Sequence, residues 1–116
     1  MSFERVCALS DVKEPGSLRV ELDDVDIAVV RFEGEVYAIQ DLCSHAAVAL
    51  SEGEVADCTI ECWMHGSRFD LRTGKPTGLP ATEPVTTFAV EVREGPDGTH
   101  DVYVDTTTTL NGVPPA

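Results

Sequence analysis

The sequence predicts an all-β protein. Short runs that alternate polar and apolar residues, or that are rich in β-branched residues, follow one another along the chain with turn residues between them. No stretch keeps a helical periodicity for longer than about two turns. The 116 residues suffice for one domain with a single modest core. We therefore expect a small antiparallel barrel or sandwich that carries a smaller β subdomain at one end.

The first forty residues contain four of the predicted strands. A first strand over 3–9 ends at a polar turn that contains Pro15-Gly16. Residues 17–22 alternate polar and apolar side chains, and residues 26–32 are rich in β-branched residues. The strand over 35–40 follows the turn at Glu33-Gly34, so the last two strands form a hairpin.

The remaining elements divide into an insert, a return to the main sheet and a tail. The insert covers about 41–80 and contains strands over 55–61 and 67–71, the second of which turns at Thr73-Gly74. The main sheet resumes with strands over 86–93 and 100–105. Residues 1–105 thus form a single domain. Residues 106–116, with four threonines and Pro114-Pro115, are expected to be a flexible C-terminal tail.

The charge of the chain excludes several classes of partner. Twenty-one acidic residues outnumber eight basic ones and give a formal net charge of −13, so nucleic acid and anionic membrane surfaces are poor partners. The acidity suits steered encounters with basic patches on other proteins, and it equally suits plain solubility. No run approaches the roughly 20 apolar residues that span a bilayer, and the N-terminus lacks the features of a signal peptide. We expect a cytoplasmic monomer.

Two short motifs contain the chemistry that the sequence predicts. They are Cys43-Ser44-His45 and Cys62-Trp63-Met64-His65, and sixteen residues separate them. Thiolate and imidazole ligands suit zinc or iron. A structural zinc site is the simplest alternative, but zinc motifs commonly pair cysteine with cysteine and histidine with histidine. Each motif here is mixed in the same order, which favours two bridged irons, one bound by both cysteines and one by both histidines.

Further residues extend these motifs into a resemblance to a known family. The chain resembles the Rieske-type ferredoxins of multicomponent ring-hydroxylating dioxygenases, from the first strand to about Asp105. The resemblance includes His65-Gly66-Ser67-Arg68-Phe69-Asp70, Thr73-Gly74 and Gly78-Leu79-Pro80-Ala81.

The resemblance implies a Rieske fold, a β-sandwich or barrel base with a small inserted cluster-binding β subdomain. It implies one 2Fe–2S cluster per chain, with Cys43 and Cys62 on the buried iron and His45 and His65 on the outer iron. The loop over 78–81 would cover the cluster from a third side. The chain would be no enzyme but a one-electron carrier, which passes electrons from a flavin-dependent reductase to a terminal non-haem iron oxygenase through weak, transient docking.

Residues near the motifs lead to finer expectations. Ser67 offers one hydroxyl near the cluster, whereas Phe69 occupies the place where high-potential relatives carry a tyrosine, so we expect a lower potential than in quinol-oxidising Rieske proteins. Trp63 and Met64 either shield the cluster, the slightly favoured interpretation, or line a docking face. Cys7 and Cys58 are expected to be small buried hydrophobes.

Two other functions compete with that of an electron carrier. A catalytic oxygenase needs a separate iron held by two histidines and a carboxylate, and His100, predicted to be a surface residue, is the only histidine left. An accessory role in redox sensing or in iron–sulfur cluster assembly stays open, because the same cluster would serve it.

Overall fold

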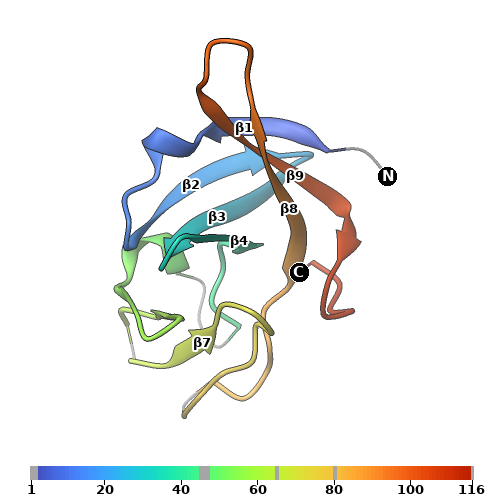
Figure 1. The fold of residues 1–116 in the computed structure, drawn as a ribbon. Helices are drawn as coiled ribbons and strands as arrows, with labels where there is room; N and C mark the ends of the chain where they lie inside the picture. The colour runs from blue at the N-terminus through green and yellow to red at the C-terminus, as the bar shows by residue number, and fades with distance from the viewer. Residues whose placement is uncertain (1–2, 45–47, 65, 80, 116) are drawn as a thin grey trace.

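Most of the strand residues lie in one strongly curved antiparallel sheet. The computed structural model describes residues 3–44, 48–64, 66–79 and 81–115. The main sheet closes almost into a barrel, with the strand order β1-β9-β8-β4-β3-β2 (Figure 1). Its strands are β1 (Glu4–Ala8), β2 (Gly16–Leu22), β3 (Val25–Phe32), β4 (Glu35–Gln40), β8 (Thr87–Glu94) and β9 (His100–Thr109). A short 3₁₀ helix, η1 (Leu9–Asp11), follows β1. The predicted all-β class is confirmed.

Two tight hairpins set the register on one side of the barrel. β2 and β3 are joined by Asp23 and Asp24, whose φ angles are 53° and 64°, and β3 and β4 by Glu33 and Gly34, with φ of 48° and 83°. Two-residue turns with positive φ at both positions match the right-handed twist of the flanking strands. The predicted hairpin around Glu33-Gly34 is therefore present, and Asp23 and Asp24 form the turn of the other hairpin.

A smaller sheet is inserted between β4 and β8. It contains β5 (Val55–Ala56), β6 (Thr59–Glu61) and β7 (Arg68–Asp70) in that order, and the 3₁₀ helix η2 (Leu50–Glu52) precedes it. The prediction of one strand over 55–61 was wrong, because Asp57 and Cys58 adopt positive φ angles of 53° and 57° and fold the segment into a hairpin. The insert itself lies at one end of the barrel, as expected (Figure 1).

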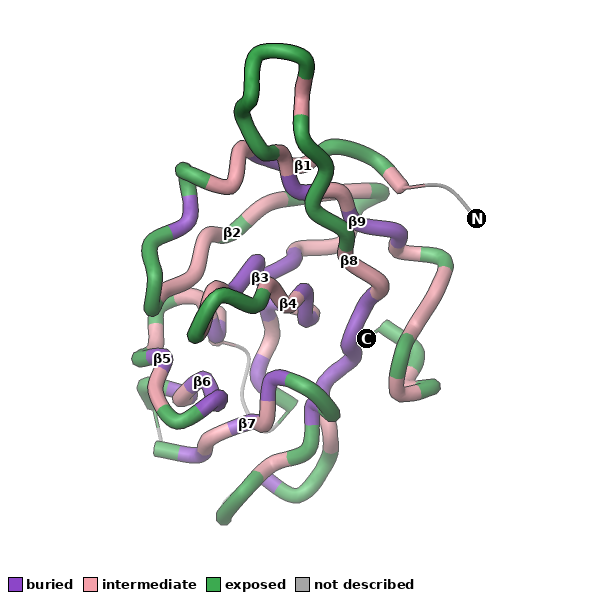
Figure 2. Tube along the Cα trace, in the orientation of Figure 1, coloured by how far each residue is buried: buried purple, intermediate pink, exposed green. Residues whose placement is uncertain are grey.

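Strand β3 separates two apolar cores. Residues 27–30 are all buried, and consecutive side chains of a strand point to opposite faces. Ala28 and Val30 pack into the core that the barrel shares with the insert, whereas Ile27 and Val29 pack into the core inside the rest of the barrel. Figure 2 shows this buried stretch as the purple trace of β3. The insert is thus fixed to the barrel by a common core.

The C-terminal residues continue the fold. β9 extends to Thr109, and the Asn111 side-chain amide donates hydrogen bonds to the carbonyl oxygens of Thr73 (2.9 Å) and Val85 (2.8 Å). The Thr86 hydroxyl donates to the Pro114 carbonyl oxygen at 3.0 Å. This placement differs from the flexible tail predicted for 106–116, because β-branched threonines suit a strand and Asn111 satisfies carbonyl groups of the insert. No described helix is long and apolar enough to cross a membrane.

Candidate metal centre

Two loops bring a pair of buried cysteines into one core. Cys43 lies just after β4, and Cys62 lies between β6 and β7. Their exposed fractions are 3% and 0%, and both belong to the core shared by the barrel and the insert. No disulfide joins any of the four cysteines, all of which lie in the described part of the chain. The predicted histidine ligands, His45 and His65, lie outside the described residues.

The two loops close in the same way. The backbone N–H of Cys43 donates to the carbonyl oxygen of Val48 at 3.0 Å, and that of Cys62 donates to the carbonyl oxygen of Ser67 at 2.6 Å. In both loops the acceptor lies five positions after the cysteine. A further bond, from Gly66 N–H to the Cys62 carbonyl oxygen at 2.9 Å, tightens the second loop, where Gly66 has a φ of +77° that a glycine adopts without strain. The backbone N–H of each cysteine therefore closes the loop that follows it.

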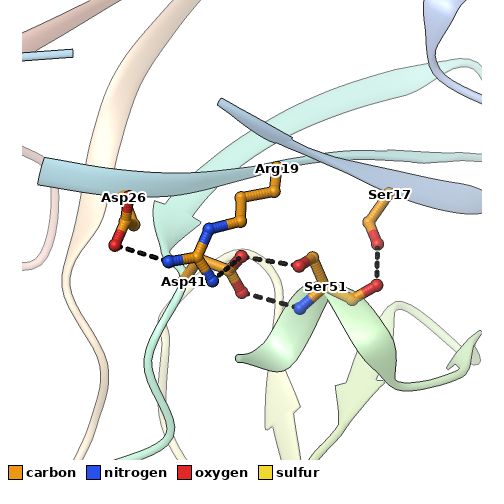
Figure 3. A network of polar contacts seen from close by, with 5 residues as sticks. All are labelled: Ser17, Arg19, Asp26, Asp41 and Ser51. Atoms are coloured by element: carbon orange, nitrogen blue, oxygen red, sulfur yellow. Dashed lines mark hydrogen bonds and ion pairs between the residues drawn. The ribbon is translucent and has the colours of Figure 1, made fainter. Parts of the chain in front are cut away.

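The first loop is anchored by a buried carboxylate. Figure 3 shows Asp41, two positions before Cys43, accepting hydrogen bonds from the Ser51 backbone N–H (2.7 Å), the Ser51 hydroxyl (2.6 Å) and the Arg19 guanidinium (3.3 Å). The Asp41 side chain has an exposed fraction of 0%. This network joins β2 to the end of β4, directly before the first loop, and to η2, which follows that loop. Sequence reasoning missed Asp41, because its partners are distant in the chain and its residue type does not distinguish it from many other acids.

The second loop and the segment before Ala81 contain exposed apolar side chains. Trp63 and Met64 directly follow Cys62 and are 50% and 47% exposed, and Leu79 is 80% exposed. Each of these two side chains is about half exposed, so both the shielding and the docking interpretation of Trp63 and Met64 stay predictions.

The other singled-out residues have structural roles. Cys7 lies in β1, where burial, with the Asp11 carboxylate as the second cause, raises the pKa of its thiol. The Sγ atom of Cys58 lies 3.6 Å from the hydroxyl of Tyr37 within the shared core. Both match the prediction of small buried hydrophobes. His100 is exposed at the start of β9, as predicted.

The cysteines and histidines of the two motifs fit an iron–sulfur cluster. Among residues 3–44, 48–64, 66–79 and 81–115, no group of three or more histidine, cysteine, aspartate or glutamate side chains is placed to hold a metal ion. Phe69 and Leu71 line the same core as the two cysteines and exclude water from the cysteine side. Two buried thiols with no disulfide between them, each followed by a histidine in the sequence, suit a centre with a thiolate end and an imidazole end.

Comparison with known proteins decides the family. The model of the Rieske [2Fe-2S] domain matches residues 2–89. The chain belongs to the Rieske [2Fe-2S] domain family. As members of this family do, the protein carries a 2Fe–2S cluster.

Relatives and solved structures agree on the kind of Rieske protein. The chain is similar to the 3-phenylpropionate/cinnamic acid dioxygenase ferredoxin subunit of Escherichia coli (strain K12), with 43% identity over 100 residues that cover 85% of this chain and 89% of the relative. Among solved structures it resembles the ferredoxin of carbazole 1,9a-dioxygenase from Nocardioides aromaticivorans IC177, with a TM-score of 0.80, 38% identity and coverage of 90% and 97%. It also resembles a chain in the complex of reduced oxygenase and oxidized ferredoxin of carbazole 1,9a-dioxygenase, with a TM-score of 0.78, 39% identity and coverage of 88% and 91%. The protein is thus an electron carrier and not a catalytic component.

Proposed function

We propose that Cys43 and Cys62 bind one iron of a single 2Fe–2S cluster, that His45 and His65 bind the other, and that the protein carries electrons singly from a flavin-dependent reductase to a terminal ring-hydroxylating oxygenase. The observation that carries this proposal is the pair of equivalent loops, each closed by its own cysteine, that bury both thiols in one core. The cluster supplies a one-electron couple whose potential the imidazole ligands raise above that of all-cysteine clusters.

The surroundings of the loops support transfer to a docked protein. The loop of Cys62 contains two exposed apolar side chains, Trp63 and Met64. A third, Leu79, lies two positions before Ala81, whose backbone N–H donates to Ser67. Aromatic residues and methionine are enriched in protein interfaces, where they bury apolar area. The related carbazole dioxygenase ferredoxin forms a complex with its oxygenase. A net charge of −13 steers the carrier toward basic partner surfaces and makes the association rate depend on salt.

The ligand set is tested by exchanging ligands one at a time. Cys43→Ser and Cys62→Ser should each abolish bound iron, acid-labile sulfide and the rhombic EPR signal of the reduced protein. Cys58→Ser is the matched control, because Cys58 is a buried cysteine of the same core outside both loops, and it should keep the cluster. His45→Cys should keep a chromophore but lower its midpoint potential strongly, because a thiolate adds negative charge at the outer iron.

The carrier role is tested by stopped-flow kinetics. Reduction by a flavin-dependent reductase, followed by oxidation by a ring-hydroxylating oxygenase, should proceed at rates that fall as ionic strength rises. Transfer of the intact cluster to an apo-acceptor protein, with no electron transfer to oxygenases, would contradict the carrier role and support the accessory one.

The oligomeric state and the cellular location complete the proposal. We infer a monomer in the cytoplasm, because short-lived encounters with two successive partners are simplest for a small single-domain carrier whose cysteines form no disulfide. Light scattering during gel filtration should give the mass of one chain, and a stable dimer would contradict this part of the proposal.

A further inference from the structure

Two serines, one in each cysteine loop, hold the same third segment. The Ser44 hydroxyl, between Cys43 and His45, donates to the carbonyl oxygen of Glu83 at 2.6 Å. The Ser67 hydroxyl, at the end of the second loop, accepts a hydrogen bond from the backbone N–H of Ala81 at 3.0 Å. Residues 81–83, here called the covering segment, are thus fixed at their first residue to one loop and at their last residue to the other.

The covering segment has few other means of attachment. Prolines precede and follow it in the sequence, at positions 80 and 84, and proline has no backbone N–H to donate. In the described part of the chain, no backbone-to-backbone hydrogen bond holds residues 81–83. Only the Ala81 side chain is buried, at 3% exposure, in the core that contains Cys43 and Cys62. The hydrogen bonds that hold this segment against the two cysteine loops are therefore those of the two serine hydroxyls.

The two hydrogen bonds differ in burial: Ser67 is buried, whereas Ser44 is exposed to water. Ser67 is 1% exposed, so the loss of its hydroxyl would leave the buried Ala81 N–H without a partner. Ser44 is exposed, and its bond competes with water. Because both bonds hold one three-residue segment, the release of either end increases the freedom of the other.

We propose that Ser44 and Ser67 form a two-point latch that closes the covering segment against both cysteine loops and keeps water and chelators from the cluster. This role rests on the ligand set proposed above. Both serines are positioning residues, since they act through the covering segment and bind no metal themselves. The latch limits the rate of cluster loss and contributes to the solvent exclusion that tunes an iron–sulfur centre.

Hydrogen–deuterium exchange of the holoprotein, followed by mass spectrometry of a peptide that contains residues 78–84, tests cooperation between the two points. Ser44→Ala should speed exchange of the covering-segment amides about threefold, although Ser44 donates only to Glu83 and not to the Ala81 amide. Ser67→Ala should speed it about tenfold, and the double variant by clearly less than the roughly thirtyfold product expected of two independent bonds, because both bonds close one segment and the loss of either already loosens it. Iron release to a chelator should accelerate in the same order.

Ser17→Ala is the matched control. The Ser17 hydroxyl also donates to a backbone carbonyl oxygen, that of Ser51 at 3.0 Å, and does not contact the covering segment. It should leave both exchange and iron release at the wild-type rate. Wild-type exchange in Ser44→Ala, or equal acceleration in Ser17→Ala, would overturn the latch. If Ser67→Ala fails to fold, Ser44→Ala alone decides.

Iron and acid-labile sulfide are measured in each sample beforehand. A folded wild-type protein without a cluster would overturn the proposed ligand set, while amide exchange of the covering segment would still decide for or against the latch.

Discussion

The buried carboxylate of Asp41 gives the sharpest stability prediction, because Arg19 pairs with two aspartates in different surroundings. The Arg19 guanidinium lies 2.5 Å from the Asp26 carboxylate and 3.3 Å from that of Asp41. Distance alone ranks the Asp26 pair as the stronger one. Burial ranks them the other way, since the Asp26 side chain is 43% exposed and that of Asp41 is 0% exposed.

The magnitudes follow from these surroundings. Asp26→Ala removes an exposed ion pair and should cost less than about 1 kcal/mol of unfolding free energy. Asp41→Ala removes the acceptor of both Ser51 donors as well as the Arg19 contact. The loss of hydrogen bonds to a buried charge, discounted for the half-exposed guanidinium, should cost about 3 kcal/mol.

Urea unfolding, monitored by tryptophan fluorescence, measures the difference. With a slope of about 1.5 kcal/mol per molar urea, Asp41→Ala should lower the midpoint by about 2 M and Asp26→Ala by less than about 0.7 M. Because release of the cluster accompanies unfolding, midpoints of variants are compared under identical conditions. Equal shifts, or a larger shift for Asp26→Ala, would refute the argument that burial outweighs distance here.

Four further predictions concern the cluster end and the fold. Trp63→Ala should leave the optical and EPR spectra unchanged but slow electron transfer to the oxygenase about tenfold in stopped-flow mixing, and an unchanged rate would exclude a docking role. Phe69→Tyr should raise the midpoint potential by about 50 mV in voltammetry if the added hydroxyl donates toward the cluster, and a constant potential would disprove this account of its tuning. Gly74→Ala should lower the thermal midpoint of unfolding far more than Gly34→Ala. Both glycines have positive φ angles (75° and 83°), but of the two only Gly74 lies where an added Cβ would collide with a backbone carbonyl oxygen, that of Val85. The Cys7 thiol, with its pKa raised by burial, should react with iodoacetamide at pH 8 more slowly than a cysteine in a peptide, and peptide-like labelling would show that β1 opens readily.

Most strands were predictable because their signals are local. The strand over 35–40 matches β4 at both ends, and the turn at Glu33-Gly34 is present. The break between β5 and β6 was missed, because Asp57 and Cys58 adopt positive φ angles although neither is a glycine, the residue that usually marks such a turn. The course of residues 106–114 was also missed, because Asn111 finds its partners in Thr73 and Val85, far away in the chain.

In the candidate site too, some residues could be predicted from the sequence and others could not. The spacing of Cys43, His45, Cys62 and His65 predicted a Rieske centre. The structure buries the two cysteines in one core, while the ligand roles of all four residues stay predictions. The supporting residues around these ligands could not be predicted. Asp41, Ser44 and Ser67 act through atoms that only folding brings near them.

The sequence by itself determined the β-strand content, the acidic surface and the chemical identity of the centre, because periodicity, net charge and ligand spacing are properties of neighbouring residues or of simple sums. The tertiary structure alone decided which acid is buried, which hydroxyls bridge the two cysteine loops and how the chain end is held. Burial and hydrogen bonding between distant segments depend on the closed barrel and its insert as a whole, so no local pattern contains them.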